Sequence, residues 1–307
     1  MKFDTAVEDN WERLGLIFRP NTKLRWSRTH AMLPTPVNID GKQLIYYSGR
    51  NILNQSNIGC FEVELGEEPR VVQSYTSPLL EPGELGCFDD NGVSPSCAIE
   101  LPGGEIAMYY IGWNPGSTTR VNLFGGLAIS HNRGKSFSRW SKSPILERTR
   151  TDPYMNTAPW VVKAEDGFRM YYVSGFKWEN KDSPRYNIKI AYSLDGYYWE
   201  RPGDSVLEFL NENETALARP YVIKESGIWK MWVTSRVGEY SIGYAESIDG
   251  INWHRNDAKL GLRPNGTHEE QSMTEYSAVI PTQDQYYMFY NGDQYGKNGI
   301  LLARHKF

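Results

Sequence analysis

Acidic side chains stand just before, or at the start of, short apolar segments that recur along the chain. They include Asp89, Asp90, Asp152, Glu214 and Glu275. A carboxylic acid can protonate a leaving group while a second carboxylate activates an attacking molecule, provided that the two converge. We expect Asp90 to be the acid, because the adjacent carboxylate of Asp89 raises its proton affinity. We expect Glu214 or Glu275 to remain ionised and to act as the base.

Basic, aromatic and further polar residues occupy related places beside the same apolar segments. We expect the following residues to bind a ligand: His30, Arg50, Asp89, Trp113, Asp152, Arg219, Arg236 and Tyr276. An arginine at such a position can hold a carboxylate or a phosphate through two parallel hydrogen bonds. Asp89 and Asp152 also have a structural interpretation, because aspartate commonly bonds to the backbone of its own turn.

A repeated unit of sequence positions these candidates. Each copy has a small or polar residue, usually a proline, then a short apolar run, a turn and an aromatic strand. Successive anchors of the repeat differ by 59, 64, 61 and 58 residues, and they are Pro36, Pro95, Pro159, Pro220 and Ala278. This period is near that of kelch-type propellers. In a propeller, the first strand of every blade faces one central channel, so residues far apart in the sequence converge there.

Two other features of the repeat have structural explanations. The residues that open the aromatic strands are expected to be core, and they are Met108, Met170, Met231 and Met288. Asp195-Gly196 and Asp249-Gly250 lie between alternating runs and predict hairpin turns. These two aspartates are therefore not candidates for the site.

The two ends of the chain complete each other. The last copy of the repeat stops near His305, before the Asp-Gly-x-x-Trp element that other copies carry. Trp11 and Arg13 match Trp199 and Arg201 in that missing element, so a strand within residues 11–18 should complete the last blade. The sequence therefore predicts an all-β fold, with residues 1–307 forming a single five-bladed β-propeller closed by an N-terminal strand. A solenoid, the alternative, should have capping repeats instead.

Composition agrees with this fold class and excludes several functions. Aromatic residues make up 13% of the chain, with 28 Gly and 17 Pro, which favours short strands and tight turns. A net charge of −4 favours neither nucleic acid nor an anionic membrane as a partner. The N-terminus lacks the apolar stretch of a signal peptide, so we expect a cytoplasmic protein. The three cysteines lack zinc-ligand spacing, and we expect no metal and no cofactor.

Several motifs resemble those of five-bladed propeller glycosidases such as arabinanases, levansucrases and invertases. They are the segment from Phe88 to Pro95, the Tyr-Tyr-x-x-Gly strand ends and the Ser-x-Asp-Gly-x-x-Trp hairpins. The resemblance covers nearly the whole chain. It implies a carbohydrate partner, cleavage of glycosidic bonds by carboxylates at the propeller centre, and sugar rings stacked on Trp113 and Tyr276.

The sequence also departs from those families. No acid is present between Ala31 and Pro36, where arabinanases and invertases carry an essential aspartate, and an extra residue interrupts the invertase-like Arg150-Thr151-Asp152-Pro153. An Asp in the second blade with Glu in the fourth and fifth is closer to the mannoside phosphorylase branch and its hydrolytic relatives. The missing acid favours direct displacement, which needs two carboxyl groups about 6.5–9.5 Å apart.

We therefore expect a glycoside hydrolase acting on an oligosaccharide or polysaccharide. A phosphorylase becomes the better interpretation if Arg50, Arg219 and Arg236 face one pocket, since the related phosphorylases use basic residues to hold phosphate. A glycan-binding propeller without catalysis, and a transferase or lyase of polysaccharide metabolism, remain alternatives.

Overall fold

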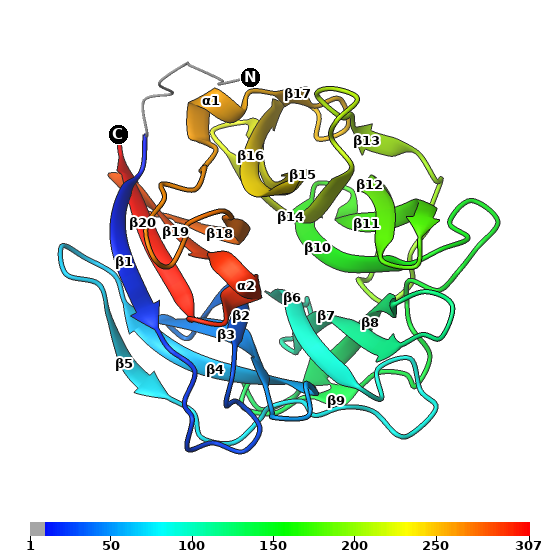
Figure 1. The fold of residues 1–307 in the computed structure, drawn as a ribbon, viewed down its shortest axis with the longest axis horizontal. Coiled ribbons are helices and arrows are strands. Elements are labelled where there is room, and N and C mark those ends of the chain that lie inside the picture. Colours follow the sequence, from blue (N-terminus) through cyan, green and yellow to red (C-terminus); the bar gives the residue numbers. More distant parts are fainter. Residues whose placement is uncertain (1–9) are drawn as a thin grey trace.

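The structure is a computed structural model that describes residues 10–307, and its regular structure is almost entirely β. Over this part of the chain, the strands pair into five antiparallel units of four strands each. Figure 1 shows the units following one another around a common centre. We number them in chain order from unit 1 to unit 5.

The first three units follow the N-terminal strand in sequence. Unit 1 contains β2 (Ala31–Ile39), β3 (Lys42–Arg50), β4 (Ser56–Glu64) and β5 (Arg70–Ser74). Unit 2 contains β6 (Gly92–Glu100), β7 (Ile106–Pro115), β8 (Val121–Ser130) and β9 (Ser138–Arg139). Unit 3 contains β10 (Asn156–Ala164), β11 (Gly167–Asn180), β12 (Ser183–Ser193) and β13 (Ser205–Leu207).

The remaining two units include the only α-helices of residues 10–307, each of which is a single turn. Unit 4 contains β14 (Ala216–Glu225), β15 (Ile228–Val237), β16 (Glu239–Ser247) and β17 (His254–Arg255), followed by α1 (Asp257–Leu260). Unit 5 contains β18 (Glu275–Pro281), β19 (Gln285–Asn291), β20 (Ile300–Lys306) and β1 (Glu12–Phe18), with α2 (Asp293–Gly296) between β19 and β20. In the part of the chain that is described, no helix has the length and apolar character needed to cross a membrane.

The N-terminal strand completes unit 5, as the sequence predicted. β1 pairs antiparallel with β20, with Glu12 opposite Arg304 and Phe18 opposite Ile300. In Figure 1, the blue strand β1 runs beside the red strand β20. The Arg304 guanidinium also donates hydrogen bonds of 2.6 and 2.9 Å to the two carboxyl oxygens of Glu12. The two ends of the described chain are thus joined within one sheet.

The first strands of the five units form a cycle of contacts. β2 contacts β6, β6 contacts β10, β10 contacts β14, β14 contacts β18, and β18 contacts β2. These strands lie innermost in Figure 1, and each contains one of the five anchors of the repeat. Residues at equivalent places in the five strands therefore surround one axis.

The second strand of each unit supplies much of the core. Tyr46, Tyr110 and Tyr172 are completely buried, and each buried aromatic side chain removes about 150–250 Å² from water. The methionines that open four of these strands are also completely buried, and they are Met108, Met170, Met231 and Met288. Their predicted role as core is confirmed.

A glycine near the end of the second strand leaves room for the segment that precedes the first strand of the same unit. A Cβ atom at Gly112 would lie 2.4 Å from the Phe88 ring and 2.6 Å from the Asp89 Cβ. In unit 1, a Cβ atom at Gly49 would lie 2.3 Å from the Ser27 Oγ. The glycine that follows the tyrosine pair in Tyr46-Tyr47-Ser48-Gly49 and Tyr109-Tyr110-Ile111-Gly112 is thus explained by close packing.

Candidate active site

A cavity of about 480 Å³ opens at the centre of the ring, and residues of all five units line it. Its aromatic lining consists of Trp113, Tyr186, Tyr240, Tyr276 and Tyr295. Its basic lining consists of Arg50, Arg120, Arg219 and Arg236. No Asp or Glu of residues 10–307 lines the cavity. The volume falls in the range of small-molecule sites, about 300–1,000 Å³.

Bulges in the first strands aim several of these side chains at the cavity. The pairing register of every first strand shifts near its start. Four residues at the shifts adopt the left-handed conformation, with φ of 57°, 49°, 48° and 57°, and they are Leu33, Ala158, Arg219 and Tyr276. All four line the cavity. A bulge re-aims a side chain, and strained backbone of this kind clusters at functional sites.

Arg219 lies at the centre of the ring and is 1% exposed. Its guanidinium donates to the Ser96 carbonyl at 2.9 Å, the Pro34 carbonyl at 3.0 Å and the Thr35 Oγ1 at 2.8 Å. It thereby joins β14 to β6 and β2. Burial lowers the pKa of Arg219 to about 10, and its Nε has no hydrogen-bond partner among the described residues.

Arg50 and Arg236 are also held by uncharged groups. Arg50 donates to Asn54 at 2.9 Å and lies over the Trp113 ring, 5.8 Å from its centroid. Arg236 donates to the Thr215 Oγ1 at 2.9 Å and the Pro184 carbonyl at 2.8 Å.

The rings of Tyr186 and Tyr240 flank Arg236, with their centroids 5.5 and 5.6 Å from its Cζ, and their hydroxyls share a hydrogen bond. Neither Arg50 nor Arg236 forms an ion pair with a carboxylate of residues 10–307.

Glu275 lies directly behind the cavity wall. It is completely buried, and neither carboxyl oxygen has a hydrogen-bond partner within the described chain. Burial raises the pKa of Glu275 well above its ordinary value, and the neighbouring Tyr276 and Arg50 oppose this only in part. Its charge would also raise the pKa of Tyr295, so the carboxyl is surrounded by cavity-lining residues. Such a shift favours the protonated form of the carboxyl, which can act as an acid.

Three other predicted carboxylates lie inside the units and are paired with cations: Asp89, Asp152 and Glu214. We call each such group a carboxylate latch: a buried acid that precedes a first strand, a base from the third strand, the fourth strand or the segment between them, and a hydroxyl from the second strand. In unit 2, Asp89 accepts from Arg139 at 2.8 Å and Tyr110 at 2.9 Å. In unit 4, Glu214 accepts from Arg255 at 2.8 and 2.9 Å and from the Ser235 hydroxyl.

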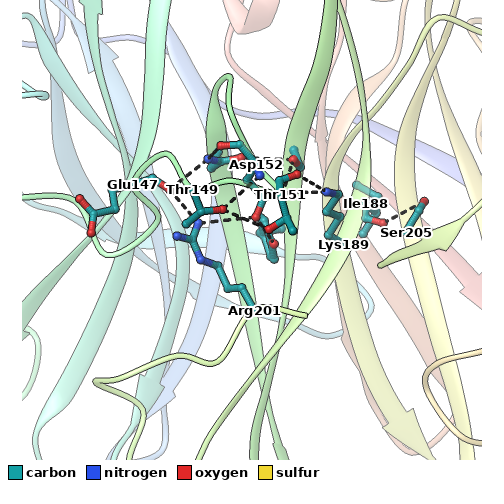
Figure 2. Close-up of polar contacts among 11 residues, drawn as sticks. Glu147, Thr149, Thr151, Asp152, Ile188, Lys189, Arg201 and Ser205 are labelled. Atoms are coloured by element: carbon teal, nitrogen blue, oxygen red, sulfur yellow. Dashed lines mark hydrogen bonds and ion pairs between the residues drawn. The ribbon is translucent and has the colours of Figure 1, made fainter. Parts of the chain in front are cut away.

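The latch of unit 3 is drawn in Figure 2. Asp152 is completely buried and accepts from Lys189 at 2.7 Å, Ser174 at 2.9 Å and Tyr172 at 2.9 Å, while Arg201 lies 3.8 Å away. Burial raises the pKa of Asp152, but the bonds from Lys189 and Ser174 outweigh it, so the pKa lies below its ordinary value. The charged partners Lys189 and Arg201 both belong to unit 3, which makes the group a structural element of that unit.

Unit 5 contains a fourth latch, which the sequence reasoning missed. Glu270 accepts from Arg13 at 2.8 Å and Tyr290 at 3.2 Å. A signal was present, because each latch arginine follows an aromatic residue by two positions, as in Trp11-Glu12-Arg13 and Trp253-His254-Arg255. In unit 1 the equivalent place is taken by hydroxyls, and those of Ser27 and Tyr47 lie 3.4 Å apart.

Two more predicted residues lie outside the cavity lining. Asp90 accepts a hydrogen bond from the Gly86 N–H at 2.8 Å within its own turn. The His30 Nδ1 lies 2.9 Å from the Thr29 Oγ1. Burial, with help from the charges of Arg50 and Lys297, lowers the pKa of His30 to about 4. His30 is therefore uncharged at neutral pH.

The structure thus brings together part of the predicted set and separates the rest. Arg50, Trp113, Arg219, Arg236 and Tyr276 line one cavity, and Glu275 lies behind its wall. We expected Asp90, Glu214 and Glu275 to share this cavity, but neither Asp90 nor Glu214 lines it. The catalytic roles of Asp90 and Glu214 stay predictions. The lining also includes residues that the sequence did not indicate: Arg120, Tyr186, Tyr240 and Tyr295.

Residues 10–307 contain no cluster of metal-ligating side chains. Nowhere in this range do three or more His, Cys, Asp or Glu side chains gather in a way that could hold an ion. Cys60, Cys87 and Cys97 are all free thiols.

The chain shares its fold with solved glycoside hydrolases, as the repeat motifs predicted. A structure described as a glycoside hydrolase has a TM-score of 0.72 at 20% identity, covering 96% of this chain and 91% of the other. A structure described under the GH130 family of mannoside phosphorylases has a TM-score of 0.67 at 14% identity, covering 96% and 93%. A thermostable family-43 glycoside hydrolase has a TM-score of 0.62 at 14% identity, covering 90% and 88%.

Sequence comparison identifies a relative at higher identity. No protein-family model matches the chain. The uncharacterized protein Rv1502 of Mycobacterium tuberculosis is 36% identical over 295 residues, which is 95% of this chain and 98% of Rv1502. Identity at this level over nearly the full length of both chains goes with a common fold, and the chain therefore belongs to the same protein family as Rv1502.

Proposed function

We propose that the chain is a closed five-bladed β-propeller enzyme that cleaves a glycosidic bond in its central cavity, with Glu275 as the general acid. One observation carries the proposal: Glu275 is a buried carboxyl, unpaired among the described residues, directly behind a wall of arginines and phenols. The fold shared with glycoside hydrolases supports the choice of reaction.

Glu275 does not itself line the cavity, so its proton passes through a hydroxyl. Tyr276 is suited to this relay, because its side chain lines the cavity and interacts with the Glu275 carboxyl. The phenol gives its proton to the leaving oxygen and takes one from Glu275. The carboxylate left behind is stabilised by the nearby Arg50 guanidinium.

The attacking molecule is better explained as phosphate than as water. Water needs a carboxylate base in the cavity, and no carboxylate of residues 10–307 lines it. Phosphate is already an anionic nucleophile, and Arg50, Arg219 and Arg236 face this one cavity. A phosphate oxygen bonds to the anomeric carbon as the glycosidic C–O bond breaks, and the relayed proton goes to the leaving oxygen. The products are a sugar 1-phosphate and the shortened glycan, and hydrolysis is the second candidate.

Oligosaccharide panels incubated with and without inorganic phosphate test this proposal. We expect sugar 1-phosphate only when phosphate is present, and a loss of about 10²–10⁴-fold in rate for Glu275→Gln, as for other general acids. Glu270→Gln is the matched control, because Glu270 is a buried carboxyl of the same unit that is paired with Arg13. Its activity per folded molecule should be unchanged.

Each alternative has a distinct outcome in the same assay. Equal release of reducing sugar with and without phosphate would select hydrolysis. Full activity of Glu275→Gln would remove Glu275 from the mechanism. Binding of panel sugars without turnover by the wild-type protein would leave a glycan-binding propeller.

A further inference from the structure

The charge of the cavity exceeds what one phosphate can balance. Four guanidinium groups line it, on Arg50, Arg120, Arg219 and Arg236, and no carboxylate of the described chain does. Glu275 is not among the lining residues, and burial raises its pKa and so favours its uncharged form. A bound phosphoryl group carries only about −1.5 to −2 charges near pH 7. Even an occupied phosphate site would therefore leave a surplus of about two positive charges.

The hydrogen-bond donors of these arginines lead to the same conclusion. A guanidinium has five N–H donors. Arg50 donates one bond to Asn54, and Arg236 donates two, to Thr215 and Pro184. The buried Nε of Arg219 has no partner in the described chain. Arg120 is exposed, and no hydrogen bond of its side chain occurs within residues 10–307. Donors of Arg50, Arg120 and Arg236 thus remain without a partner among the described residues.

The arginines lie on different walls of the cavity. A single small anion could be bound by arginines on one wall alone. Arg50 ends β3 of unit 1, Arg120 lies in the β7–β8 turn of unit 2, and Arg236 lies in β15 of unit 4. Phenol and indole side chains lie between them in the lining: Trp113, Tyr186, Tyr240, Tyr276 and Tyr295. Aromatic faces and hydroxyls suit a sugar ring, and the outlying arginines suit acidic groups attached to it.

We propose that the substrate sugar carries its own acidic group, as a hexuronate does, and that the carboxylate is bound by guanidinium groups of Arg120 and Arg236 while phosphate occupies a separate place. This inference rests on the proposed function for the identity of the ligand as a sugar. It adds the substrate class: an acidic glycan.

Calorimetric titration tests the proposal with defined probes. Glucuronate and galacturonate are compared with glucose and galactose, each with no phosphate and with saturating inorganic phosphate. We expect a uronate to bind at least tenfold more tightly than its neutral parent, since a hydrogen bond to a charged group contributes about 1.5–3 kcal/mol. We also expect uronate binding to persist when phosphate is saturating, because the two anions occupy separate places.

Variants test whether the tighter binding of uronates depends on the cavity arginines. Arg120→Gln and Arg236→Gln should each weaken uronate binding roughly tenfold and leave glucose binding unchanged. Arg120 is exposed, so its replacement does not threaten folding. Arg70→Gln is the control, since Arg70 is an exposed arginine that pairs with Glu64 on the outer edge of unit 1.

Two results would overturn the inference. Equal affinity for uronates and their neutral parents would show that the surplus charge does not select the sugar. Complete displacement of uronate by phosphate would show that the arginines serve a single anion. The proposed function fails independently: uronate binding without cleavage of any oligosaccharide leaves acidic-sugar recognition standing and removes the catalysis.

Discussion

Two sets of arginines in this molecule have opposite surroundings. Arg139 and Arg255 lie inside their units and touch the buried carboxylates of Asp89 and Glu214 at 2.8 Å. Arg50 and Arg236 line the central cavity and are held by an amide, a hydroxyl, a carbonyl and aromatic rings. Charge inside the units is balanced within the fold, whereas the cavity arginines have no carboxylate partner among the described residues.

The same contrast separates the acids. Asp152 has three hydrogen-bond donors, one of them the cationic Lys189, and a lowered pKa, whereas Glu275 has no cationic hydrogen-bond donor within the described residues and a raised pKa. Both side chains are completely buried. Burial alone therefore does not distinguish the two acids, and the presence or absence of a cationic partner does.

The largest expected effect on stability comes from breaking a latch. Arg255→Met leaves the Glu214 carboxylate buried without its guanidinium, which should lower the free energy of unfolding by about 3–5 kcal/mol. Urea denaturation at pH 7 measures this change. The double variant Glu214→Gln with Arg255→Met should recover part of the loss, because no unpaired charge remains.

Arg50→Met tests whether the cavity arginines differ from the paired arginines inside the units. It removes one hydrogen bond, to Asn54, and no carboxylate of the described chain loses an ion-pair partner. The free energy of unfolding should fall by only about 0.5–1.5 kcal/mol. Equal destabilisation by Arg50→Met and Arg255→Met would contradict the distinction.

A smaller effect concerns how stability depends on pH. The pKa of Glu275 is raised in the folded state, so its contribution is complete below about 4.5 and is lost as the pH rises towards the folded value. The pKa of Asp152 is lowered, so its contribution is present above about 3.8 and is lost as the pH falls. Glu275→Gln should therefore gain stability over wild type as the pH rises, by at most about 1.4 kcal/mol per pH unit.

Urea denaturation at several pH values between about 4.5 and 8 checks these signs. Asp152→Asn should behave in the opposite way, with its deficit relative to wild type shrinking as the pH falls below about 4. Unfolding free energies of wild type and Glu275→Gln that run parallel over the whole range would show that Glu275 is ionised in the fold.

Much of the fold was predictable from the sequence, because the repeat consists of residue types that strands and tight turns favour. Pro36 and Pro159 lie in first strands, and the expected closing strand matches β1 (Glu12–Phe18). Asp195 accepts hydrogen bonds from the N–H groups of Tyr197 and Tyr198, as its place in a turn predicted. Local patterns of this kind are decided by neighbours in sequence.

The site was predictable only in part, because the direction of a side chain depends on packing between units. The acids were expected to converge because all of them stand near first strands. Asp89 and Glu214 precede those strands and turn into their own units, whereas Glu275 begins its strand and lies beside the cavity. Tyr276 faces the cavity because of a bulge, and no local pattern in the sequence indicates a bulge there.

The protonation state of Glu275 is the most direct test of the proposed mechanism. NMR titration of protein labelled with ¹³C at the glutamate side-chain carboxyl, compared with Glu275→Gln, measures it without knowledge of the substrate. We expect one carboxyl resonance to keep the chemical shift of the protonated form at about pH 7 and to be absent from the variant. If every glutamate is already ionised at that pH, Glu275 is no proton donor under neutral conditions, and the mechanism proposed for the cavity is wrong.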